Sequence, residues 1–60
     1  MKKSLQQFIK ENRQEIDECI IRALGGDPKS YRYKNDEERR LWILNDEGLY
    51  LWARSEGVRI

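Results

Sequence analysis

The stretch from Asn35 to Ser55 constrains the fold most, because it holds both tryptophans and most of the large apolar residues of the second half. In a helical interpretation, Asn35 caps a helix and Glu38 follows three residues later, the spacing of a capping box. Acidic residues then fill the first turn, where the helix dipole favours negative charge. This helix would run through Leu44 and stop at Asp46.

A third helix would follow directly. Asp46 can cap it, and Leu49, Trp52 and Ala53 have the i, i+3, i+4 spacing that places side chains on one helical face. Gly57 suits the position just after a helix, where the backbone often turns left-handed. The stretch therefore predicts two short helices joined by a tight turn.

A β-hairpin is the alternative for the same residues. Residues 41–44 and 49–52 are β-prone runs, and the intervening Asn-Asp-Glu-Gly can form a hairpin loop with a bulge. However, neither run alternates apolar with polar residues, as a strand with one wet face should. Two strands alone also make a marginal sheet. The sequence favours an all-α fold, with an α+β fold containing a C-terminal hairpin as the alternative.

The first third of the chain predicts one long amphipathic helix over residues 4–24. Ser4 and Gln7 have capping-box spacing and would open it. Placed at 100° per residue, the apolar side chains form a single stripe that must be buried: Leu5, Phe8, Ile9, Ile16, Cys19, Ile20 and Ala23. We expect this helix to pack on the C-terminal helix–turn–helix.

Asn12 interrupts that stripe. With Glu15 it has the spacing of an N-cap and its third helical residue, so a kink or break near Glu11 is favoured over a continuous helix with an inward asparagine. The run Gly25-Gly26-Asp27-Pro28 marks the end of the first helix. At the other end of the chain, residues 58–60 either fold back to cover the core with their two aliphatics or fray.

Length and composition limit what else this chain can do. Sixty residues make a single domain, 1–60, and a domain of this size buries only about 60% of its unfolded surface. One cysteine and no histidine rule out an intramolecular disulfide and an ordinary zinc site, and the formal net charge is only +1. No apolar run is long enough to span a membrane. We therefore expect a non-catalytic cytoplasmic protein with no cofactor and no metal.

The aromatic residues of the second half form the leading candidate site. If residues 41–53 are helical, their large side chains cover every side of the helices and cannot all point into so small a core. Tryptophan and tyrosine beside arginine are typical of interface hot spots. The hypothesis is a protein-binding module, whose partner is another protein or a second copy of the chain, acting through Trp42, Tyr50, Leu51 and Trp52.

A basic-aromatic loop gives the alternative hypothesis of nucleic-acid binding. Cations can follow a phosphate backbone while tyrosine rings stack on unpaired bases. The candidate residues are Tyr31, Arg32, Tyr33 and Lys34 in the loop, together with Arg39 and Arg40. In the competing interpretation, one of the two loop tyrosines packs over the core. A base-reading helix–turn–helix is disfavoured, since Glu47 and Arg54 would occupy positions that are usually apolar in that motif.

The segment ERRLWILNDEGLYLWARSEG resembles small phage and prophage proteins of unknown function. These share an acidic-basic lead-in, an LW-x-x-NDEGLY core and a W-x-R-S end. The resemblance extends through FIKENRQEIDECI in the first helix and so covers most of the chain. It implies an accessory protein that binds a host or phage macromolecule, and it implies no active site.

Overall fold

The computed structural model describes residues 2–32 and 34–60, and this part of the chain forms an all-α fold. Its elements are α1 (Leu5–Ala23), a short 3-10 helix (Pro28–Ser30), α2 (Asp36–Asn45) and α3 (Glu47–Ser55). The predicted long first helix and the two short helices after it are confirmed. Residues 41–44 and 49–52 are helical, so the hairpin alternative was wrong.

The predicted N-caps of the three helices are present. The Ser4 hydroxyl accepts a hydrogen bond from the backbone N–H of Gln7 at 3.0 Å. The Asn35 side chain accepts one from the N–H of Glu38 at 2.8 Å. Asp46 caps α3 by accepting from the N–H of the residue three positions on, at 3.0 Å. These bonds satisfy donors that a helix start leaves unpaired, so all three helices begin where local sequence dictates.

The predicted kink in α1 lies at Asn12, whose backbone is non-helical at φ −132° and ψ 26°. The prediction of an N-cap role at this position needs correction. The Asn12 side-chain amide donates backward to the carbonyl of Phe8 at 2.9 Å, instead of capping the turn that follows. A bond of this kind satisfies a carbonyl of the preceding turn and holds the bend in place.

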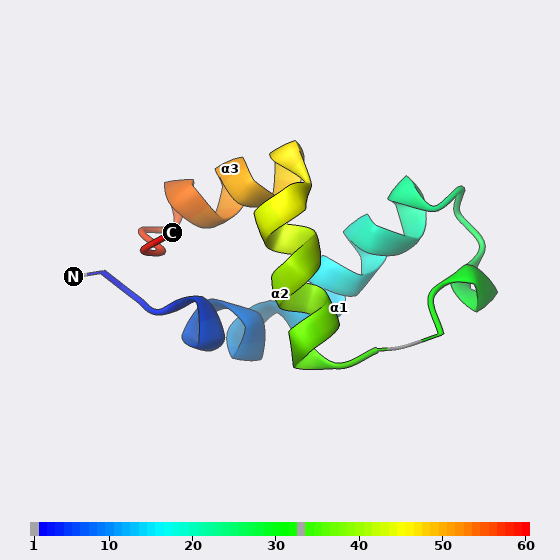
Figure 1. The fold of residues 1–60 in the computed structure, drawn as a ribbon, viewed down its shortest axis with the longest axis horizontal. Helices are drawn as coiled ribbons and strands as arrows, with labels where there is room; N and C mark the ends of the chain where they lie inside the picture. The colour runs from blue at the N-terminus through cyan, green and yellow to red at the C-terminus, as the bar shows by residue number, and fades with distance from the viewer. Residues whose placement is uncertain (1, 33) are drawn as a thin grey trace.

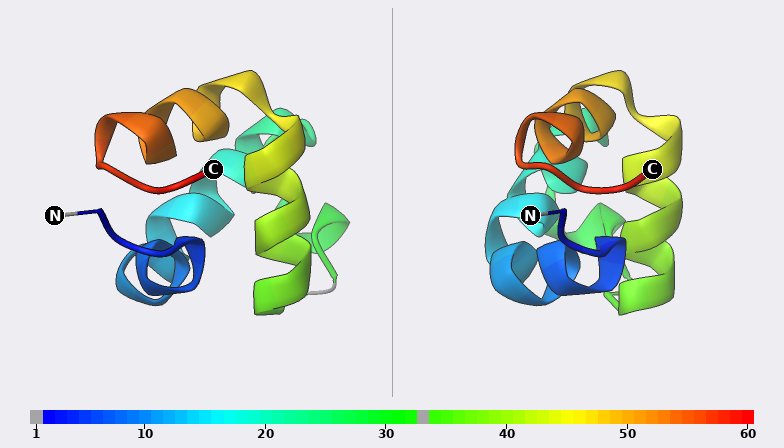
Figure 2. Two further views of the ribbon diagram at one scale, coloured as in Figure 1. Left: turned by 60° about the vertical axis from the view of Figure 1, so that its left-hand side comes forward. Right: turned by 90° about the vertical axis from the view of Figure 1, so that its left-hand side faces the viewer.

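The three helices contact one another pairwise. Figure 1 shows α2 standing across α1, and α3 turning back toward the end where the chain begins. Figure 2 shows the two terminal segments side by side at that end. There Lys3 donates to the carbonyl of Gly57 and accepts from the N–H of Arg59, each at 3.2 Å. Gly57 has φ 83°, a left-handed conformation that glycine adopts without strain.

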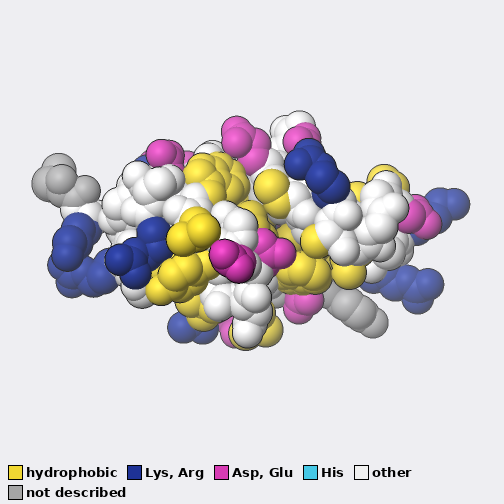
Figure 3. Space-filling model, turned by 90° about the horizontal axis from the view of Figure 1, so that it is seen from above, with side chains coloured by type: hydrophobic (Ala, Val, Ile, Leu, Met, Phe, Trp, Pro, Cys, Tyr) yellow, Lys and Arg dark blue, Asp and Glu magenta, His cyan; other side chains and the backbone are white. Residues whose placement is uncertain are grey.

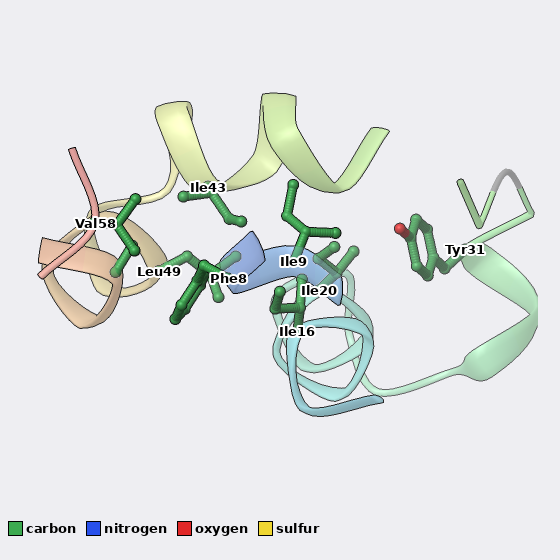
Figure 4. Close-up of a cluster of buried hydrophobic side chains, with 9 residues drawn as sticks. Phe8, Ile9, Ile16, Ile20, Tyr31, Ile43, Leu49 and Val58 are labelled. Atoms are coloured by element: carbon green, nitrogen blue, oxygen red, sulfur yellow. The ribbon is translucent and has the colours of Figure 1, made fainter. Parts of the chain in front are cut away.

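The core is a row of apolar side chains between the helices. In Figure 4, Val58 lies at one end of the row and Tyr31 at the other. The buried residues are Phe8, Ile9, Ile16, Ile20, Tyr31, Ile43, Leu49, Ala53 and Val58. Burial of Val58 confirms that the C-terminal tail folds back over the core. The prediction that Ala23 is buried was wrong: it is exposed, at the C-terminal end of α1.

Candidate functional site

The inward face of α2 carries a buried cation. Arg39 is only 8% exposed, and its guanidinium makes a two-pronged contact with Asp17 of α1. The Nε–Oδ1 and Nη2–Oδ2 distances are both 2.9 Å. A buried charge needs such pairing, because removing it from water is costly. Arg39 therefore joins α1 to α2.

Asp36 extends this ion-pair network at the start of α2. It accepts from Arg39 Nη1 at 2.8 Å and from Arg13 of α1 at 3.0 and 2.7 Å. The side-chain amide of Gln6 adds a fourth bond at 3.2 Å. Hydrogen bonds from Arg13, and then from Arg39, hold the pKa of the Asp36 carboxyl well below its ordinary range. The network is thus a fixed junction between the two helices.

The structure corrects the nucleic-acid hypothesis at two of its residues, Arg39 and Tyr31. Arg39 is enclosed by carboxylates and is not free to contact phosphate. Tyr31 is 4% exposed, so its ring belongs to the core, as the competing interpretation anticipated. Burial, together with the charge of Asp17, raises the pKa of Tyr31 to about 12. Among the described residues, its buried hydroxyl finds no hydrogen-bond partner.

The other described residues of that hypothesis are cations at the surface. Arg32, Lys34 and Arg40 are exposed, and Arg40 lies 3.9 Å from Glu37. Tyr33 lies outside the described residues. Of the predicted basic-aromatic loop, the described part therefore presents charge at the surface but no exposed ring for a base to stack on.

The predicted aromatic surface is also divided by the fold. Trp52 is half-buried and packs edge-on against Phe8, with ring centroids 4.9 Å apart and planes at 74°. Tyr50 is half-buried, and its hydroxyl accepts a long 3.4 Å bond from Arg54. Trp42 is half-buried as well, whereas Leu51 is 57% exposed. Part of the predicted set thus supports the core, and part reaches the surface.

Two leucines of α2 that the sequence interpretation did not single out are exposed. Leu41 is 46% exposed and Leu44 39% exposed. The sequence does carry a signal for them, since both lie away from Ile43 on a helical wheel, and Ile43 is fully buried. Aromatic residues are the stronger sequence signal for an interface, and the predicted interface residues are therefore mainly aromatic.

An open hollow of ≈ 280 Å³ runs along α2 beside Leu41. We call it the α2 groove, and it is lined by Glu38, Leu41, Trp42, Asn45 and Asp46. Glu38, Leu41 and Asn45 are spaced i, i+3 and i+7, which puts them in line on one side of the helix. The groove therefore has apolar residues between two carboxylates.

Neither a metal-binding cluster nor a membrane-spanning helix is found among the described residues. Within residues 2–32 and 34–60, no three histidine, cysteine or acidic side chains are grouped to hold a metal ion. No helix in the described parts of the chain has the length and apolar character to cross a membrane. No protein-family model, curated protein or solved structure matches the chain. A functional inference therefore depends on the geometry of α2 and its groove.

Proposed function

We propose that this domain is a non-catalytic accessory module that binds another protein through the α2 groove and the neighbouring Leu44. The observation that carries the proposal is the groove itself, a hollow of ≈ 280 Å³ with Leu41 and Trp42 in its lining. The resemblance of the chain to small phage proteins supports an accessory role and adds no catalytic one.

The apolar character of this surface favours a partner over bulk water. A single exposed leucine is ordinary on a small protein. Here two leucines on successive turns are 46% and 39% exposed, and one of them, Leu41, lines a hollow together with the half-buried Trp42. Large apolar side chains gathered around a depression are typical of protein interaction sites.

The charges at the groove define what kind of partner surface would fit. Glu38 and Asp46 are both lining residues and neither appears in an ion pair among the described residues. The amide of Asn45 is already used, donating to the carbonyl of Leu41 at 2.7 Å. A partner with an apolar side chain for the centre and cations for the rim would be complementary.

Site-specific photo-crosslinking tests the proposal in cells that produce the protein. A photoreactive phenylalanine analogue replaces Leu41 in one variant and Gln14, exposed on α1, in the control. We expect a discrete protein adduct from position 41 that position 14 does not give. An adduct of twice the protein's mass would identify the partner as a second copy. Absence of any adduct, or equal adducts from both positions, would reject this surface as the interface.

A further inference from the structure

The end of the molecule where the two termini meet contains a second hollow, of ≈ 290 Å³. We call it the terminal hollow, and it is lined by Lys2, Arg54, Gly57, Val58, Arg59 and Ile60. It shares no lining residue with the α2 groove. Three of its residues are cationic, and they come from opposite ends of the chain.

Pairing of the terminal segments explains how these cations meet. Lys3 and Val58 form a parallel bridge, and the residues on either side of a bridged residue point to the opposite face of the ribbon. Val58 is 4% exposed and points inward, so Arg59 and Lys2 point outward together. Arg54 reaches the same place from the last turn of α3.

These cations are not neutralised by the described part of the chain. The neighbouring Lys3 is paired with Glu11 at 2.9 Å, but no carboxylate forms an ion pair with Lys2, Arg54 or Arg59. Arg54 lies 5.9 Å from the centre of the Tyr50 ring, which leaves most of its donors free. Figure 3 shows Lys and Arg side chains at this end of the molecule and others at the opposite end, with most of the acidic side chains between them.

We propose that the terminal hollow binds a phosphate-type oxyanion through Lys2, Arg54 and Arg59. Guanidinium groups present paired N–H donors that match two oxygens of one phosphate. The C-terminal end of α3 carries roughly half a negative charge and the α-carboxylate of the lining residue Ile60 a full one, and the three cations together outweigh them. The hollow is roughly ten times the volume that one water occupies in the liquid, so a phosphate and part of its organic group fit.

The surroundings of the hollow favour an organic phosphate over a bare ion. Ile60 is a half-buried lining residue, and its side chain supplies apolar surface against which the carbon part of a phosphomonoester can lie. Gly57 adds no side chain, which keeps the space between the cations open. This site is independent of the proposed protein-binding groove, so either can fail without the other.

NMR titration of the isotope-labelled protein with inorganic phosphate at pH 7.5 and constant ionic strength tests the proposal. We expect saturable shifts of the backbone N–H signals of Gly57, Val58 and Arg59 and of the Nε–H of Arg54. Titration with chloride over the same range gives the background. Shifts that fail to saturate, or that chloride reproduces, would overturn the proposal.

Variants then assign the shifts to the hollow. R59Q should weaken phosphate binding about tenfold, as expected for loss of a charge-assisted hydrogen bond. R54Q should weaken phosphate binding by a similar factor. Because Arg54 lies in α3 and Arg59 does not, a loss of affinity in both variants cannot come from a disturbed helix. R32Q removes the same charge from the exposed loop and should leave the affinity unchanged. An equal loss in R32Q would mean that only net charge matters, and the site would be rejected.

Discussion

Each face of α2 carries a side chain of the kind that usually lies on the other face. The inward face holds Arg39, which is 8% exposed, whereas the outward side leaves Leu41 and Leu44 46% and 39% exposed. The cation is inside because Asp17 and Asp36 satisfy its donors. The leucines remain partly exposed on the outward side. The comparison teaches that the inward face holds α2 to α1, whereas the outward face is left exposed, as the proposed interface requires.

Breaking the Arg39 pairing should give the largest effect. Asp17→Asn leaves a buried guanidinium without its two-pronged carboxylate partner, and we expect the free energy of unfolding to fall by about 3 kcal/mol. This is a large share of the stability of so small a domain. Urea denaturation measures it. Glu18→Gln, at the exposed neighbouring position, is the matched control and should cost under about 0.5 kcal/mol. Similar values for the two variants would mean that the network does not hold α1 to α2.

Trimming the apolar part of the inward face should have a smaller effect. Ile43 is fully buried, so Ile43→Val should lower the free energy of unfolding by about 1 kcal/mol through one lost methylene group. Its neighbour Leu44 is the control for the outward side. Leu44→Gln should cost less than Ile43→Val in the same urea experiment, even though it is chemically the more drastic change. The reverse order would contradict the assignment of faces.

Acid should weaken the inward junction gradually. The folded state lowers the pKa of Asp36 below its ordinary value of 3.8. Its contribution to stability is therefore complete above that value and declines as the pH falls below it. We expect the stability difference between the wild type and Asp36→Asn to shrink from pH 5 to pH 2. The difference should be modest, because the side chain is 28% exposed to solvent. A difference independent of pH would show that the charge of Asp36 is not what stabilises the junction.

Among the buried residues, Tyr31 in the loop before α2 should give the smallest change in the free energy of unfolding when it is replaced by phenylalanine. The buried hydroxyl has no hydrogen-bond partner among the described residues, so its removal sacrifices no bond. We expect thermal and urea unfolding to change by no more than about 0.5 kcal/mol, or to show a slight gain. A loss of 1 kcal/mol or more would indicate that the hydroxyl is bonded after all.

Local hydrogen bonds explain why the fold class was predictable. Ser4, Asn35 and Asp46 each bind a backbone N–H three residues on, and such short-range bonds can be read directly from sequence. The kink at Asn12 was predictable for the same reason, although its side chain bonds backward.

The candidate sites depend on contacts between distant residues, which the sequence alone does not reveal. Arg39 was assigned to a nucleic-acid surface because its carboxylate partner lies 22 residues away, on another helix. Lys2 and Arg59 share a hollow only because the terminal segments pair. Helical periodicity can locate Leu41 and Leu44 outside the core, but the hollow beside them forms only once α2 is packed.

The free energy of unfolding of the double variant Leu41→Gln, Leu44→Gln tests the central claim most directly. Glutamine keeps the helix propensity and much of the side-chain length of leucine, so the substitution changes mainly the polarity of the outward side. If this side is free for a partner, the double variant should lose less than about 1 kcal/mol relative to the wild type. A loss close to the roughly 3 kcal/mol expected for Asp17→Asn would show that the leucines belong to the core, and the account of α2 would be wrong.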